Sequence, residues 1–324
     1  MHLTIVYHLY RGYEHSAKSL ESILKQTDKN FELIFVADSI DKKVKKVFKD
    51  IDFYKDFANA RFVSMSTYVG HSYSYNYVTK ITKTPYIYFA SGSCVYEPDF
   101  VKKINQEIEQ NNPDFIVLDG NGKRHDQDLK YLKKDNYLDY LYVLLDSSHL
   151  NKVFNIDFLN KNKIHWVNFK HYPAVYLFEL YRSAKKIGLV TDKLFSHHIS
   201  KNPTFNVGDL VYQFEYLNEN FENDSFYQKH FDQIQYLFIR TLTFSYLEKI
   251  YWRWLSVKHD HFKSAVEFVT NYLEENLADW KANKTLNSPT NVDSKKLIDY
   301  IKNFTNTRKT INTFLTLVDN GEKK

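Results

Sequence analysis

The first 120 residues alternate between apolar runs of strand length and stretches with helical spacing, and this alternation constrains the fold more than any other feature. The apolar runs are Leu3–His8, Phe31–Val36, Arg61–Met65, Tyr86–Ala90 and Phe115–Leu118. Strands that are buried on both faces of a sheet are typically continuous apolar runs rather than alternating ones. The sequence therefore predicts an α/β fold with a mostly parallel sheet that is covered by helices on both faces.

Helices connect the predicted strands and dominate the second half of the chain. Within the first part, we expect helices near 42–49 and 72–82, and one that begins at Glu97-Pro98-Asp99. After Asp135 the pattern becomes mainly helical, and a short strand is expected at 187–190. The further predicted helices are 137–145, 156–160, 174–186, 208–220, 226–256, 260–282 and 294–318. We interpret residues 1–204 as an α/β domain and residues 205–324 as a helical region.

Composition excludes several classes of protein. The single cysteine, Cys94, rules out an internal disulfide framework and a cysteine-based zinc site, and a reducing cytoplasm is the simplest location. The N-terminus has no cationic segment before its apolar run, which argues against a cleaved signal peptide. No apolar stretch approaches the roughly 18 residues of a transmembrane helix. The net charge of +5 is spread over the chain, which suits an anionic ligand or an acidic membrane surface but is too diffuse to indicate nucleic-acid binding.

Five segments occur in an order and at a spacing that resemble a known family. They are His8-Leu9-Tyr10-Arg11, Leu20–Thr27 (Leu-Glu-Ser-Ile-Leu-Lys-Gln-Thr), Phe31–Ser39, Gly70–Asn76 (Gly-His-Ser-Tyr-Ser-Tyr-Asn) and Tyr86–Phe100, which ends in Glu-Pro-Asp-Phe. Together they resemble the nucleotide-sugar-binding half of family-2 glycosyltransferases, which have the GT-A fold. Past residue 120 the likeness is confined to Tyr181–Ile187, which is similar to the helix that follows the family's catalytic acid.

The resemblance implies a nucleotide site. Asp38 matches the family acid that contacts the uracil or ribose, although a turn or helix-cap role is an equal alternative. Tyr10 could stack on the base, with ordinary packing as its alternative. Asn76 remains from the family's Arg-Asn pair, whose arginine position is Tyr75 here. Arg11 is a substitute cation that could offset the charge of the diphosphate.

The family's metal motif is replaced. Its members hold a divalent cation with an Asp-x-Asp pair, whereas this chain has Ser91 and Ser93 at those positions. Hard cations prefer charged oxygen ligands, and two neutral hydroxyls hold such a metal poorly. We therefore expect no cofactor, and Mn²⁺ or Mg²⁺ is the weaker alternative.

The family's acidic catalytic run is also missing. Counting back from Ala184 places Tyr172-Pro173-Ala174 at that run, and none of the three is a base. His171 is the nearest candidate for the general base that deprotonates the acceptor hydroxyl, and a structural or surface histidine is its alternative. Glu179 lies within a helix and is interpreted as a solvated or paired surface acid. An insertion could instead place Asp157 or Asp119 there.

Other histidines and aromatic residues are interpreted as structural. His197-His198 cannot both face one metal because neighbouring strand residues point to opposite faces. His259 and His261 are two positions apart, so they do not share a helix face. The segment Lys249–Trp254 combines aromatic and basic residues, which suits a membrane interface, but packing on the sheet domain or on a partner subunit is the better interpretation. The membrane alternative would place the protein at the inner face of the membrane.

Two functional hypotheses remain. The first is a divergent glycosyltransferase that moves a hexose from a nucleoside-diphosphate sugar, a UDP-sugar above all, to a glycan, lipid or protein acceptor. The second is a catalytically inactive GT-A-like module that binds a glycan or a nucleotide, or that partners an active transferase. The loss of both the Asp-x-Asp pair and the acidic run motivates the second.

Overall fold

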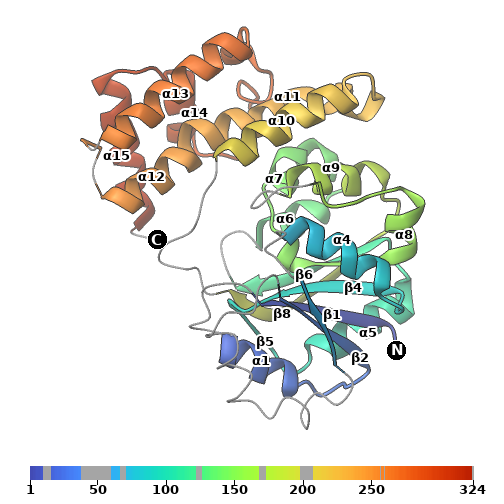
Figure 1. Cartoon of the computed structure of the whole chain (residues 1–324). Helices are drawn as coiled ribbons and strands as arrows, with labels where there is room; N and C mark the ends of the chain where they lie inside the picture. Colours follow the sequence, from blue (N-terminus) through green and yellow to red (C-terminus); the bar gives the residue numbers. More distant parts are fainter. Residues whose placement is uncertain are drawn as a thin grey trace. The chain divides into compact units, whose positions relative to one another are not determined.

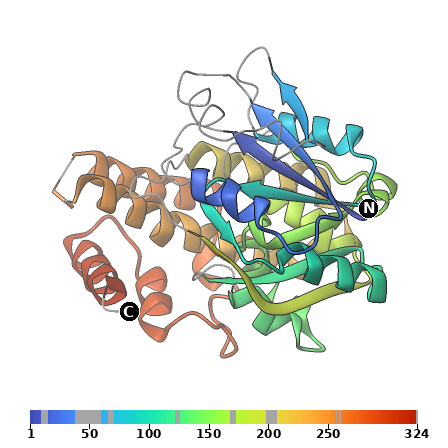
Figure 2. The same cartoon turned by 90° about the horizontal axis from the view of Figure 1, so that it is seen from below.

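The computed structural model describes residues 1–9, 16–37, 60–65, 71–121, 126–167, 173–197, 207–255, 257–258 and 260–322. By their internal contacts the residues of the chain form two units. One comprises Met1–Asp139 with Val143–Ser200, and the other comprises Tyr140–Tyr142 with Lys201–Lys324. Figures 1 and 2 show both units, which are described separately here as the sheet unit and the helical unit.

The sheet unit contains one eight-stranded sheet with the order β3-β2-β1-β4-β7-β6-β8-β5. Neighbours pair in parallel within β3-β2-β1-β4 and between β6 and β8. Strand β7 pairs antiparallel with both β4 and β6, and β5 pairs antiparallel with β8. The strands are β1 (Leu3–Leu9), β2 (Phe31–Ala37), β3 (Arg61–Ser64), β4 (Tyr86–Ser91), β5 (Cys94–Tyr96), β6 (Phe115–Asn121), β7 (Lys152–Asn155) and β8 (Ile187–His197). The predicted α/β fold with a mostly parallel sheet is confirmed, and the sheet is of mixed type.

Helices cover both faces of this sheet (Figure 1). Alternate residues of β1 such as Ile5 and Tyr7 enter a core that includes Leu20 of α1 and Ile104 of α5. On the other face, Tyr75 of α4 stacks on Phe89 of β4 with ring centroids 4.1 Å apart. The described helices of α-type are α1 (Ser16–Leu24), α4 (His71–Ile81), α5 (Phe100–Asn111), α6 (Asp126–Leu132), α7 (Leu141–Leu145), α8 (Ile156–Lys161) and α9 (Ala174–Ser183). Double coverage explains why the strands were apolar throughout rather than alternating.

Several boundaries in the sheet unit differ from the predictions. The helix expected at 174–186 ends at Ser183, and the short strand expected at 187–190 extends to His197. The helix expected at 137–145 is a 3₁₀ turn over Tyr137–Tyr140 followed by α7. Strand β8 is longer because β6 and β5 both pair with it, so contacts from distant sequence stabilise its polar end. The helix expected near 42–49 lies outside the described residues.

The helical unit consists of helices that pack through aromatic side chains. Its helices are α10 (Val207–Phe221), α11 (Ser225–Arg240), a π-helical segment (Thr241–Tyr246), α12 (Leu247–Trp254), α13 (Asp260–Asn276), a 3₁₀ turn (Trp280–Ala282), α14 (Lys295–Lys302) and α15 (Arg308–Glu322). Phe214 of α10 stacks on Phe238 of α11 at 4.3 Å, and Phe262 of α13 contacts Phe314 of α15 at 5.3 Å. None of the described helices has both the length and the apolarity needed to cross a bilayer.

Three long helices predicted for this region are interrupted. The helix expected at 226–256 contains the π-helical segment, and its last described helical residue is Trp254, after which Leu255 adopts a left-handed conformation. The helix expected at 260–282 ends at Asn276. The helix expected at 294–318 is two helices, α14 and α15, because hydrogen bonds among the hydroxyls of Thr305, Thr307 and Thr310 stabilise a turn between them.

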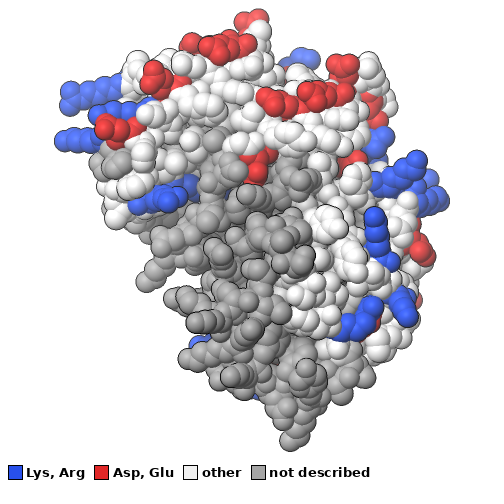
Figure 3. All heavy atoms as spheres, viewed as in Figure 1, with Lys and Arg blue, Asp and Glu red and all other residues white. Residues whose placement is uncertain are grey.

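Charge is mixed over the visible surface. Figure 3 shows both basic and acidic side chains on the described part of this face. A continuous basic stripe, which nucleic-acid binding favours, is not seen among the described residues of this face.

Candidate functional site

The carboxyl ends of β1 and β4 lie side by side at the centre of the sheet. In their parallel pairing, His8 is opposite Ser91. Ile5 and Tyr7 of β1, and Tyr88 and Ala90 of β4, enter the core on the side of α1 and α5, so His8 and Ser91 share the opposite face. Ligands of α/β sheets bind outside the carboxyl ends of the strands, which makes this edge the candidate site.

The turn after β4 is held by hydrogen bonds at both ends. The Oγ atoms of Ser91 and Ser93 lie 2.7 Å apart and hydrogen-bond to each other, and the Ser93 amide donates to Ser91 Oγ at 3.2 Å. The Ser91 amide donates to the Tyr96 hydroxyl at 3.1 Å, and Ser19 Oγ donates to the Ser91 carbonyl at 3.1 Å. The two serines therefore form a closed polar turn.

This turn does not fit a divalent metal. Its side chains offer two neutral hydroxyls that satisfy each other, whereas Mg²⁺ and related cations prefer carboxylate oxygens. Among the residues that the structure describes, no group of three or more His, Cys, Asp or Glu side chains could hold a metal ion. The neutral hydroxyls of Ser91 and Ser93 are poor ligands for a divalent cation, and this argues against a metal at this position.

Beside the turn lies a cluster of histidine and aromatic rings that sequence reasoning missed. The ring of His8 lies 4.2 Å from that of His71, the first residue of α4, and 5.8 Å from that of Tyr75. His149 contacts Tyr75 at 5.8 Å and Trp166 at 5.1 Å. His8 and His71 both fall inside segments that carried the family resemblance, but only the folded sheet brings them together.

Asn76 is the one predicted nucleotide-binding residue that the structure describes. Its side-chain nitrogen donates to the Trp166 carbonyl at 2.6 Å, and its side-chain oxygen accepts from the Trp166 amide at 2.8 Å. These bonds fix the chain at Trp166 against α4, and the Trp166 ring stacks on Tyr176 of α9 at 3.9 Å. A nucleotide contact by Asn76 stays a prediction.

The other predicted site residues lie outside the described residues. These are Tyr10, Arg11, Asp38 and His171. In the sequence, Tyr10 directly follows the end of β1 at Leu9, and Asp38 directly follows the end of β2 at Ala37. Their roles stay predictions.

Glu179 is not the surface acid that the sequence suggested. It lies on α9, half-buried, and its Oε2 atom is buried without a hydrogen-bond partner among the described residues. Burial raises the pKa of Glu179, and nearby His165 and Arg182 partly oppose this effect. A carboxyl group with a raised pKa is a candidate general base. Its position in the middle of a helix gave no signal of burial in the sequence.

The remaining candidates are placed as follows. Asp157 lies exposed in the first turn of α8, and Asp119 lies at an irregularity of β6. His197 ends β8 and pairs with Cys94 of β5, whereas His198 and His259 lie outside the described residues. His261 lies on α13, against the Trp254 ring at 4.9 Å.

Comparisons with known proteins agree on one type of protein. The family model described as Glycosyl transferase family 2 matches residues 9–183. The crystal structure of S. aureus TarS 1-349 superposes with a TM-score of 0.64 and 16% identity, covering 100% of this chain and 92% of that chain. The same part of TarS in complex with UDP-GlcNAc gives 0.65 at 16% identity, with the same coverage. Its complex with UDP gives 0.62 at 17%. No curated protein matches the sequence significantly.

Proposed function

Because this chain belongs to glycosyl transferase family 2, we propose that it transfers a hexose from a UDP-sugar to a glycan, lipid or protein acceptor. The match over residues 9–183 carries the proposal, since it begins at the end of β1 and includes β4 and the Ser91–Ser93 turn. The neighbouring TarS structures were solved with UDP-GlcNAc and with UDP, which supports a uridine nucleotide as the donor class.

In this proposal the donor lies at the carboxyl ends of β1, β2 and β4. Asp38 contacts the uracil or ribose, Tyr10 stacks on the base, and Asn76 contributes to the nucleotide site from α4. In the sequence, Tyr10 directly follows β1 and Asp38 directly follows β2. Ligands of α/β sheets bind at the carboxyl ends of strands, which supports such a site.

Charge on the departing diphosphate has to be stabilised without a metal at the Ser91–Ser93 turn. We assign this role to Arg11, with His8 and His71 as additional hydrogen-bond donors. The contact between the two imidazole rings and the register of His8 with Ser91 support this assignment. Histidine suits the role because an imidazole ring carries an N–H donor even when it is neutral.

A base is needed to take the proton from the acceptor hydroxyl. His171 is the residue that the sequence order favours for this role. Glu179 is the alternative that its burial supports, because its raised pKa brings it closer to neutral pH. Glu179→Gln and His171→Gln distinguish the two, since only loss of the true base lowers kcat by the roughly 10²–10⁴-fold expected of general-base catalysis.

The test is a transfer and hydrolysis assay with a panel of sugar nucleotides, run with Mn²⁺, with Mg²⁺ and with a chelator. We expect turnover of at least one UDP-sugar that the chelator does not abolish. His71→Gln should lower turnover, whereas His2→Gln is the matched control because His2 precedes the opposite end of β1. Turnover that requires added metal would refute the metal-independent part of the proposal.

A second candidate is a catalytically inactive module that binds a nucleotide or a glycan, or that partners an active transferase. The mutual hydrogen bond of Ser91 and Ser93 favours it, because these hydroxyls replace the metal ligands on which the family's chemistry depends. Calorimetric binding of UDP without turnover of any donor would select this candidate.

The aromatic and basic segment Lys249–Trp254 bears on membrane contact and on the location of the protein. Lys249–Trp254 suggested an interface with a membrane or a partner subunit, and Trp252 and Trp254 are 38% and 39% exposed. They lie two positions apart on α12 and so do not form one apolar face. We keep a cytoplasmic location in the proposal, to be tested by cell fractionation, and leave membrane contact out of it.

A further inference from the structure

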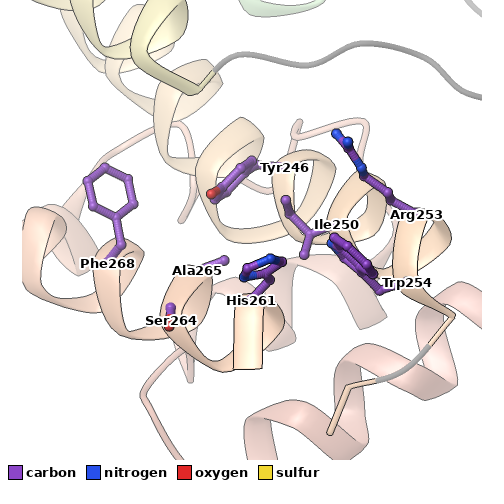
Figure 4. Close-up of a pocket in the computed structure, with 8 residues that line it drawn as sticks. All are labelled: Tyr246, Ile250, Arg253, Trp254, His261, Ser264, Ala265 and Phe268. Carbon is purple, nitrogen blue, oxygen red and sulfur yellow. The ribbon is translucent and has the colours of Figure 1, made fainter. Parts of the chain in front are cut away.

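A groove lies within the helical unit, between α12 and α13 (Figure 4). Its volume is about 420 Å³, which is within the range of small-molecule sites. The lining residues come from the end of the π-helical segment, from α12 and from α13; they are Tyr246, Ile250, Arg253, Trp254, His261, Ser264, Ala265 and Phe268.

Aromatic rings occur along the groove. Phe268 lies toward one end, and Trp254 and Arg253 lie toward the other (Figure 4). The Trp254 and Phe268 side chains are each 39% exposed, so solvent reaches their rings. His261 meets the Trp254 ring edge-on at 4.9 Å, which fixes the ring against α13.

The polar groups in the groove are two hydroxyls, two ring N–H-bearing groups and one guanidinium. Among the described lining residues, Arg253 is the only permanently charged side chain and none is a carboxylate. Its guanidinium lies 5.8 Å from the centre of the Trp254 ring. A ligand ring that binds on Trp254 would therefore lie close to a cation.

We propose that this groove binds an anionic saccharide, with a sugar ring on Trp254 and its carboxylate, sulfate or phosphate group on Arg253. The apolar face of a pyranose packs on an aromatic ring, while its hydroxyls meet Ser264, Tyr246 and His261 along the groove. The planar guanidinium matches the anion with two parallel hydrogen bonds.

Other occupants fit less well. A membrane surface is flat and would require exposed apolar side chains on one helix face, whereas the groove is concave and Trp252 points away from the face that carries Trp254. A single nucleotide has one base that could stack on one aromatic side chain, whereas the groove has Phe268 toward one end and Trp254 toward the other. A chain of sugar units fits this distribution. The inference does not depend on transferase activity.

Calorimetric titration of the full chain tests the proposal. The probes are three anionic saccharides, namely a hyaluronan tetrasaccharide, trigalacturonate and glucose 6-phosphate, with neutral chitotetraose for comparison. We expect at least one anionic probe to bind, and Trp254→Leu and Arg253→Gln each to weaken that binding about tenfold or more. Trp252→Leu is the matched control, since Trp252 is equally exposed on the same helix but does not line the groove. Thermal melts confirm that each variant is folded.

Several results would overturn the proposal. They are no binding of any anionic probe at millimolar concentration, binding that survives Trp254→Leu, and equal loss in Trp252→Leu. Binding of UDP or of phosphatidylglycerol vesicles that Trp254→Leu abolishes would assign the groove to those ligands instead. A failure of sugar transfer would leave these titrations unaffected, so the two proposals fail separately.

Discussion

The side-chain oxygens of Ser91 and Ser93 lie 2.7 Å apart and hydrogen-bond to each other at the end of β4. Two ionised carboxylates at these positions would repel each other unless a cation lay between them. The serine pair is thus stable without a metal.

Restoring the acidic pair is expected to create metal dependence. The double variant Ser91→Asp/Ser93→Asp should be less stable than the parent in chelator, because the two charges repel. Added Mn²⁺ should recover the stability and increase the affinity for UDP. Thermal melts and calorimetry with and without Mn²⁺ measure both effects. The isosteric Ser91→Asn/Ser93→Asn variant is the control, and an identical response in both variants would contradict the prediction.

Glu179 is expected to make stability depend on pH. Its pKa is raised in the folded chain from an ordinary value of 4.5, so the folded state retains a proton that the unfolded state releases. This contribution to stability is present at low pH and is lost as the pH rises through the folded-state pKa. Glu179→Gln keeps the neutral form, so its Tm relative to the parent should rise as the pH increases above the ordinary pKa of 4.5. Glu274→Gln, at an exposed position on α13, is the matched control.

Lys152 is expected to be essential for stability. Its ammonium group is fully buried and contacts Asp128 Oδ2 at 3.0 Å, Ser147 Oγ at 2.7 Å and Asn151 Oδ1 at 3.0 Å. Lys152→Met leaves Asp128 buried without its partner, which costs about 3–5 kcal/mol. Urea unfolding measures the loss. The double variant Lys152→Met/Asp128→Leu should recover part of it, and a loss below about 1 kcal/mol in the single variant would refute the role.

Cys94 is expected to be unreactive in the folded chain. Burial raises the pKa of its thiol to about 12, so little thiolate exists near neutral pH. At about pH 8, a disulfide reagent should label Cys94 in the native protein only at the rate at which local unfolding exposes the thiol. In denaturant the labelling should be immediate. Fast labelling of the native protein would show that the turn beside Ser93 opens readily.

Much of the sheet could be predicted from the sequence, because double burial makes its strands apolar throughout. Tyr86–Ala90 was predicted and Tyr86–Ser91 is observed. Strand β7 was missed because it is only four residues long and begins with Lys152. The burial of this lysine depends on its ion pair with Asp128 of helix α6. Strand β5 has three residues, too few for a periodic pattern.

The candidate site was only partly predictable. The replacement of the acidic pair by Ser91 and Ser93 is visible in the sequence, but their mutual hydrogen bond is a property of the turn. The contact of His8 with His71 joins residues more than sixty positions apart, and no local pattern indicates it. Glu179 is a similar case, since His165, which acts on its carboxyl group, lies outside its helix.

The short strand β5 has a consequence for ligand binding. Only Gly92 and Ser93 separate it from β4, and its pairing of Cys94 with His197 fixes the far side of the turn to β8. The backbone of the Ser91–Ser93 turn is therefore ordered on both sides, in the state that a ligand contacting this turn would meet. Binding there does not have to offset the conformational entropy that a flexible loop would lose, and affinity can come from fewer contacts.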